Sequence, residues 1–188
     1  MSGDFDFEHD YQYPEYRERC TGTNVNEQTL LATDYLNHFN ELVMTLEMLG
    51  DMPELLEEAK MWAPKDYKDH FRDSTIADKE LAVEAYDHAP PKFKEPFEQN
   101  IEKINHLILT SVDRLEKDIM MGDMELVRIN ASALSKVIQR IMDMCSANIH
   151  GSETTMDQEE IDNIIGSEPE PAEESGGNAQ ADIDALFD

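Results

Sequence analysis

The chain has 188 residues and a formal net charge of −27, from 42 acidic and 15 basic side chains. This length suits one domain plus tails, and the acidic balance makes nucleic-acid backbones and anionic membranes poor partners. No apolar run reaches the roughly 20 residues of a membrane span, and the acidic N-terminus is unlike the basic start of a signal peptide. We therefore expect a cytoplasmic protein whose partners are proteins with basic surfaces.

The charge is distributed unevenly. Residues 151–188 carry 12 acids and no Lys or Arg, and residues 1–19 carry six acids against two bases, which leaves 24 acids and 13 bases for residues 20–150. The two cysteines suggest neither a disulfide framework nor a metal site, and Cys145 should be a small core residue. Because the six histidines lack metal-ligand spacing, we expect no metal and no cofactor.

Residues 1–25 mix acids, aromatic residues, Pro and Gly without a sustained period, which predicts a largely disordered N-terminal tail that includes Cys20. Packing against the protein's own surface is the expected fate of its aromatic residues. These are Phe5, Phe7, Tyr11, Tyr13 and Tyr16.

Apolar residues at steps of three and four predict helices from residue 26 onward, with Gly and Pro at their ends. The shorter predicted helices span about 26–49, 51–62 and 78–87, and a further turn of helix is expected within 65–75.

Two long helices are predicted at about 92–121 and 123–149, separated by Gly122. A turn this short makes the helices antiparallel, so they should form a hairpin whose shared seam is the core. The expected apolar stripes are Phe97, Ile101, Ile104, Ile108, Val112, Leu115 and Ile119 on the first helix and Val127, Leu134, Val137, Ile138, Ile141, Met144 and Cys145 on the second. No segment has the pattern of a strand. We predict an all-α helical bundle over 26–150, built on this hairpin, with disordered acidic tails at both ends.

The C-terminal tail contains a repeated nine-residue pattern. Residues 157–165 (DQEEIDNII) and 179–187 (AQADIDALF) share Gln, Ile and Asp at the same offsets and lie 22 residues apart. In each copy the apolar residues fall at i, i+3 and i+4, on one face of a helix. So short a peptide is not a stable helix in water, and we expect it to fold by laying that face into a partner's groove. The expected partner-binding residues are Gln158, Ile161, Asp162, Ile164 and Ile165, and Gln180, Ile183, Asp184, Leu186 and Phe187.

The two copies resemble the short peptides by which the flagellar switch protein FliM and the chemotaxis phosphatase CheZ capture the response regulator CheY. Those peptides commonly read Ser-Gln-x-x-Ile/Val-Asp-x-Leu-Leu/Phe. Both copies match their Gln, Ile and Asp, with Asp157 and Ala179 in place of the leading Ser, and the first copy ends in Ile164 and Ile165 where the second has Leu186 and Phe187. The resemblance implies a non-catalytic interaction protein that binds a CheY-like receiver domain, in chemotaxis or flagellar motility control.

Residues 137–144 (VIQRIMDM) are similar to the stretch that follows the catalytic glutamine of CheZ-type phosphatases, which are helical hairpins dimerised into a four-helix bundle. Carried over by position, Lys136 stands in place of that glutamine and Ser132 in place of an aspartate, and neither has the same hydrogen-bonding chemistry. Gln139 and Asp143 offer a catalytic pair one turn on, in reversed order, although a solvated helix face is the simpler interpretation. The alternatives are a divergent CheZ-like response-regulator phosphatase, with a homodimer possible, and a helical adaptor that recruits another protein complex.

Overall fold

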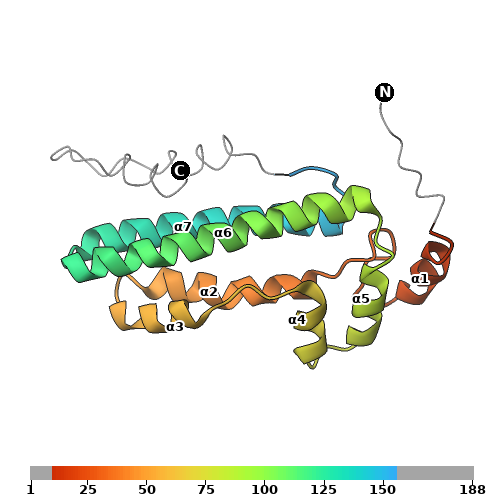
Figure 1. The fold of residues 1–188 in the computed structure, drawn as a ribbon, viewed down its shortest axis with the longest axis horizontal. Helices are drawn as coiled ribbons and strands as arrows, with labels where there is room; N and C mark the ends of the chain where they lie inside the picture. The colour runs from red at the N-terminus through yellow and green to blue at the C-terminus, as the bar shows by residue number, and fades with distance from the viewer. Residues whose placement is uncertain (1–9, 156–188) are drawn as a thin grey trace.

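A computed structural model describes residues 10–155. Seven α-helices and two short 3-10 helices within this range form two layers (Figure 1). The α-helices are α1 (Tyr13–Cys20), α2 (Asn37–Met48), α3 (Leu56–Met61), α4 (Tyr67–Asp73), α5 (Lys79–Tyr86), α6 (Pro91–Met121) and α7 (Met124–Ile149), and the 3-10 helices are η2 (Thr33–Leu36) and η3 (Pro53–Leu55). The described residues contain no strand, only an isolated bridge between Val25 and Ala32. The prediction of an all-α fold is confirmed.

The long helices α6 and α7 form the predicted hairpin. Gly122 ends α6 with φ +78°, a left-handed conformation that glycine adopts without steric cost. Asp123 then caps α7, because its carboxylate accepts a hydrogen bond from the backbone N–H of Leu126 at 3.0 Å. None of the helices in residues 10–155 combines the length and apolarity that crossing a membrane requires.

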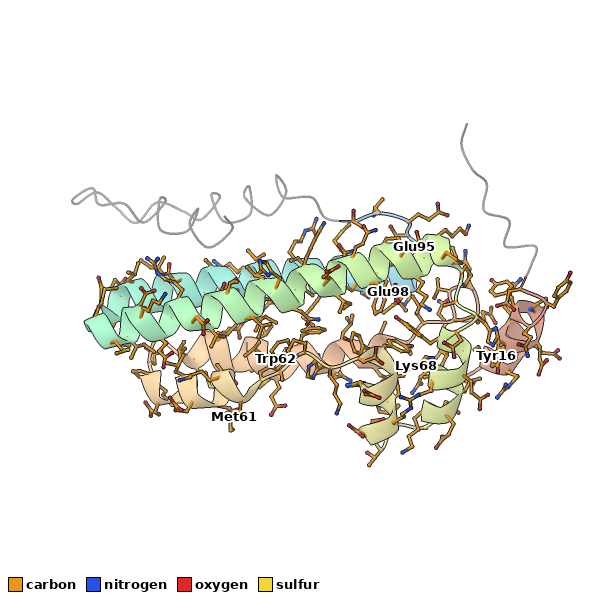
Figure 2. The ribbon with its side chains drawn as sticks, in the orientation of Figure 1. Tyr16, Met61, Trp62, Lys68, Glu95 and Glu98 are labelled. Carbon is orange, nitrogen blue, oxygen red and sulfur yellow. The ribbon has the colours of Figure 1, made fainter. Side chains whose placement is uncertain are left out.

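The core lies between this hairpin and a second layer, in which α2 packs against α7 and α3 against α6. Both predicted stripes are buried, apart from the half-buried Ile119 and Met144. Cys145 is buried in this core, as expected. Figure 2 shows Trp62 beneath α6 and Met61, which is 79% exposed, on the outer side of α3.

An aromatic cluster joins the second layer to α6. Its centre is Tyr35, which is 2% exposed and whose ring centroid lies 5.9 Å from those of Phe39 and Phe97 and 5.3 Å from that of Tyr67. Aromatic pairs at these separations each contribute about 0.5–1.5 kcal/mol beyond the area they bury. The cluster therefore connects η2, α2, α4 and α6 at one place.

The helix predicted over residues 26–49 begins later than expected. The side-chain oxygen of Asn26 accepts hydrogen bonds from two backbone N–H groups, at 2.9 and 3.0 Å, and Leu30 has φ +59°. The N–H of Ala32 donates to the hydroxyl of Tyr67 at 2.9 Å. The side chains of Asn26 and Tyr67 thus accept hydrogen bonds from backbone N–H groups that would otherwise bond within a helix. As a result, α2 starts only at Asn37.

The N-terminal region also differs from the prediction, since residues 10–25 are not a disordered tail. Cys20 is 1% exposed, and Tyr16 stacks on His88 with ring centroids 4.3 Å apart. Arg19 forms an ion pair with Glu84 of α5 at 2.8 Å. Contacts with α5 and the segment after it therefore stabilise α1, although its own sequence has little helical periodicity.

The predicted packing of the aromatic residues on the protein's own surface is confirmed for Tyr16, which is buried, and for the half-buried Tyr13. The hydroxyl of Tyr13 donates to the backbone oxygen of Gln28 at 2.8 Å. Tyr11 is 88% exposed, and Phe5 and Phe7 lie outside the described residues.

Two histidines beside the aromatic cluster should make folding sensitive to acid. The Nε2 atoms of His38 and His70 lie 2.8 and 3.1 Å from the backbone oxygens of Ala63 and Asp34, so each donates a hydrogen bond. Burial lowers the pKa of both imidazoles below their usual 6.5. Below about pH 6.5, the two histidines therefore bind more protons in the unfolded chain than in the folded one. Their contribution to the free energy of unfolding should fall as the pH drops below about 6.5 and stay constant above that pH.

The expected result is that His38→Gln/His70→Gln loses less stability than the unmodified protein between about pH 7 and pH 5. Urea unfolding at a series of pH values measures this difference. His106→Gln is the control, because His106 is exposed on α6. Equal pH dependence in the double variant and the unmodified protein would contradict the assignment.

Candidate functional site

The ten motif residues predicted to bind a partner belong to segments 157–165 and 179–187, which lie outside the described residues. The structure does describe the segment that connects them to α7. Residues 150–155 follow the end of that helix and lie against the start of α6 (Figure 1). We refer to residues 150–155 as the tail root.

A buried amide holds the tail root. Asn148 is fully buried in the last turn of α7, and its side-chain nitrogen donates to the backbone oxygens of Ser152 and Thr154 at 3.0 and 2.7 Å. Its side-chain oxygen accepts from the amide nitrogen of Asn100, on α6, at 2.9 Å. Both ends of the amide are thus used, which offsets the cost of burying it.

An ion pair holds the same segment, and a hydrogen bond fixes the end of α7 from which it starts. The hydroxyl of Thr29 donates to the backbone oxygen of Ile149 at 2.6 Å, and Lys92 forms an ion pair with Glu153 at 3.1 Å. Gly151 has φ +105°, and a Cβ there would lie 3.3 Å from the side-chain oxygen of Gln28. The tail root therefore leaves the domain at a defined position, beside the first turn of α6.

The alternative catalytic pair lies on α7. The side-chain nitrogen of Gln139 donates to the carboxylate of Glu47, on α2, at 2.8 Å, and Ser135 donates to the same oxygen at 3.2 Å. Asp143 is exposed one turn further on. The Gln139 amide nitrogen is thus hydrogen-bonded within the protein, at the junction of α7 with α2, to Glu47 and, at 3.4 Å, to the hydroxyl of Ser135.

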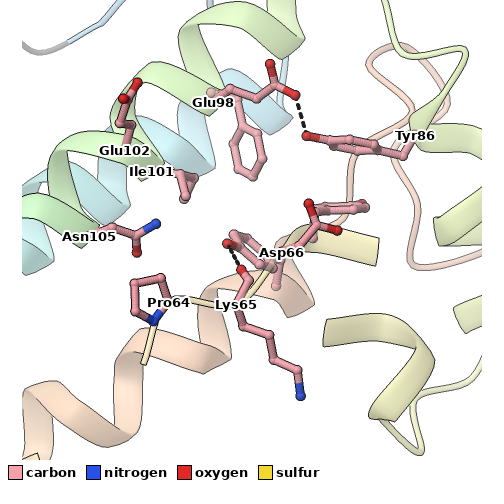
Figure 3. A pocket seen from close by; sticks show the side chains of 11 residues that line it. Pro64, Lys65, Asp66, Tyr86, Glu98, Ile101, Glu102 and Asn105 are labelled. Carbon is pink, nitrogen blue, oxygen red and sulfur yellow. Dashed lines mark hydrogen bonds between the residues drawn. The ribbon is translucent and has the colours of Figure 1, made fainter. Parts of the chain in front are cut away.

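The structure also contains a pocket that the sequence did not suggest. It has a volume of about 310 Å³ and lies between α6 and the segment that leads into α4 (Figure 3). Two tyrosine hydroxyls donate hydrogen bonds at its wall: Tyr86 to Glu98 at 2.6 Å, and Tyr35 to the backbone oxygen of Lys65 at 2.7 Å. The side-chain oxygen of Asn105 is buried and accepts no hydrogen bond from the described residues.

The polar groups in this pocket are suited to hydrogen bonding. Burial, with the nearby Glu98 carboxylate, raises the pKa of Tyr86, and burial raises that of Tyr35, so both hydroxyls stay protonated. Its lining residues come from positions 35, 64–67, 86 and 97–105, which share no local motif. No local pattern in the sequence therefore marks this pocket.

Neither thiol is arranged for catalysis or for metal binding. Burial raises the pKa of Cys20 to about 11 and also raises that of Cys145, so both remain protonated and poorly nucleophilic. Within residues 10–155, no three or more His, Cys, Asp and Glu side chains come together in a way that could hold a metal ion.

Comparison with known proteins adds no relative. No protein-family model, no curated protein and no solved structure matches this chain.

Proposed function

We propose that this protein is a non-catalytic interaction protein that binds a CheY-like receiver domain through segments 157–165 and 179–187, in chemotaxis or flagellar motility control. The observation that carries the proposal is the repeat itself: Ile-Asp, one intervening residue and two bulky apolar residues occur twice in a tail without a single Lys or Arg. Acids beside an apolar helical edge suit a groove that basic side chains surround.

The described residues support a tethering role for the tail root. Asn148 and Lys92 hold it on the domain, and the first motif begins only two residues beyond Thr155. The 13 residues 166–178, rich in Pro, Glu, Gly and Ser, have the composition of a linker spanning roughly 20 Å. Two motifs at this spacing raise the effective concentration of the second once the first has bound.

The test is a titration of the full chain with a receiver domain, with and without a phosphomimetic activator, followed by calorimetry. We expect saturable binding of micromolar order or weaker per motif, because ordering a short peptide offsets most of the small area that it buries. The control is Ile161→Ser/Ile183→Ser, which removes the central apolar residue of each copy and should abolish binding. Absence of saturable binding to the activated receiver by the unmodified chain would refute the proposal.

A second measurement addresses the phosphatase alternative. The rate of phosphoryl loss from the receiver is followed with the unmodified chain and with Gln139→Ala. Under our proposal neither protein changes that rate. Acceleration by the unmodified chain that Gln139→Ala removes would instead establish the divergent phosphatase.

A further inference from the structure

The α6–α7 hairpin carries other helices on one side only. In Figure 1, α2, α3, α4 and α5 all lie on the same side of it. Two contacts mark this inner side: Glu116 of α6 with Lys60 of α3 at 2.6 Å, and Gln139 of α7 with Glu47 of α2 at 2.8 Å. No helix within residues 10–155 covers the opposite side.

Basic side chains gather on that opposite side. Because an α-helix turns by about 100° per residue, positions at steps of three and four share one face. On α6, the outer face lies roughly half a helical turn around the axis from Glu116, which contacts α3. On α7, the outer face points away from α2, which Gln139 contacts. The bases on the outer face, which we call the basic face, are Lys103, Arg114 and Lys117 on α6 and Lys136 and Arg140 on α7. Arg114 also forms an ion pair with the buried Asp118, one turn further along α6, at 3.3 Å.

The composition of this side is unusual for so acidic a chain. Residues 20–150 hold 24 acids against 13 bases, yet the positions nearest the centre of this side of both helices hold no acid. Those positions are 92, 96, 99, 103, 107, 110, 114, 117 and 121 on α6, and 126, 129, 133, 136, 137, 140, 144 and 147 on α7. The acids next to them are Asp113 and Asp118 on α6 and Glu125 and Asp143 on α7. Between the two rows of bases lie apolar side chains, with Leu107, Ala133 and Val137 buried and Met144 half-buried.

We propose that the basic face binds segment 157–165 of the same chain. That segment has four acids and no base. As a helix it would present Ile161, Ile164 and Ile165 on one edge, with Glu160 and Asp162 flanking that edge on its two sides. An apolar edge between two acids matches an apolar strip between two rows of bases, both in chemistry and in order.

The position of the tail root makes this contact possible within one chain. The ion pair of Glu153 with Lys92 places the root on the same side of α6 as the basic face, since position 92 belongs to that row. Lys103 lies 11 residues further along α6, about 16 Å away. The four residues from Glu153 to Asp157 span up to about 14 Å, and a nine-residue helix adds about 13 Å. The segment therefore reaches from the root to the middle of the basic face.

A second copy of the chain is a poorer occupant of this face. A two-fold symmetric dimer places the same patch of each subunit against its copy. Here that would bring the bases of one basic face against those of the other, and like charges across an interface oppose association. The acidic segment of the same chain carries the opposite charge and is already tethered.

This inference has a regulatory consequence that rests on the proposed function. The apolar edge of segment 157–165 would contact either the basic face or the receiver. One copy of the segment can therefore bind only one of the two at a time. Binding to the hairpin lowers the fraction of chains whose first motif is free, and the apparent receiver affinity falls by that fraction.

Hydrogen–deuterium exchange on the full chain tests the contact. In about 50 mM salt, we expect the amides of 160–165 to exchange more slowly than in a free 155–188 peptide, by about tenfold, and to approach the peptide's rate in about 500 mM salt. Lys136→Glu/Arg140→Glu should abolish this protection. Arg17→Glu/Arg72→Glu, which makes the same charge change at exposed positions on α1 and α4, should retain it.

Two results would overturn the inference. One is exchange of 160–165 at the free-peptide rate in the unmodified chain at low salt. The other is protection that rises with protein concentration, which would assign the contact to another copy of the chain.

The same variants separate this inference from the receiver proposal. If both hold, Lys136→Glu/Arg140→Glu binds the receiver about two to ten times more tightly than the control variant. Receiver binding without amide protection would leave the proposed function standing and remove the contact with the hairpin. Amide protection without receiver binding would support the contact with the hairpin and refute the proposed function.

Discussion

Phe97→Ala is expected to lower the free energy of unfolding by about 3–5 kcal/mol, the range for removing a large aromatic side chain from a packed core. Phe97 is 1% exposed, and its ring contacts those of Tyr35 and Tyr67, with centroids 5.9 and 6.1 Å away. The substitution therefore leaves a cavity where α6 meets the second layer. Since whole domains have only about 5–15 kcal/mol of stability, the variant should be close to unfolding at physiological temperature. Urea unfolding followed by circular dichroism measures the change.

Leu109→Ala is the matched control for Phe97→Ala. Leu109 lies on the same helix but is 49% exposed, so its removal should change stability by no more than about 0.5 kcal/mol. A loss below about 1 kcal/mol in Phe97→Ala would contradict the central position that the structure gives to this ring.

Asn148→Leu is expected to cost about 1–3 kcal/mol and to release the tail root. The substitution removes the acceptor of the Asn100 amide and the donor of two bonds to Ser152 and Thr154, and buried polar groups that lose their partners carry that penalty. Hydrogen exchange should show faster exchange at 152–155, and thermal unfolding should show a lower midpoint.

The double variant Asn100→Leu/Asn148→Leu separates the hydrogen bond from the shape of the site. Replacing both partners with apolar groups leaves neither amide unsatisfied, so the double variant should be more stable than Asn148→Leu alone. A double variant whose loss equals the sum of the two single losses would show that the two amides do not depend on each other.

The long elements could be predicted because their signal is local and repeated. The stripe from Phe97 to Ile119 covers six turns of helix, and Gly122 marks the turn, so periodicity alone determines the hairpin. The short N-terminal helix lacked such a signal. It depends on pairs such as Arg19 with Glu84, 65 residues apart, which no window along the sequence can contain.

The other residues that no sequence pattern marks also depend on contacts between distant parts of the chain. Asn148 appears as an ordinary polar residue in a helix, and its role follows only from the fold that brings Asn100 and Thr154 to it. The pocket beside Tyr86 likewise combines residues from four separate stretches. The repeated motifs, by contrast, are recognised from the sequence alone. The described residues show only where the segment that leads to them leaves the domain.

The antiparallel hairpin also gives the molecule two unlike ends. The 26 residues of α7 extend about 39 Å, with Gly122 beyond one end and the tail root at the other, beside the start of α6. A fluorophore attached at the exposed residue 125, near the Gly122 end, and one attached at residue 155 would therefore sit at a long separation, set by α7 and by the contacts that hold the tail root. That pair provides an internal ruler against which a third label, carried on the motifs, could report their distance from each end in living cells.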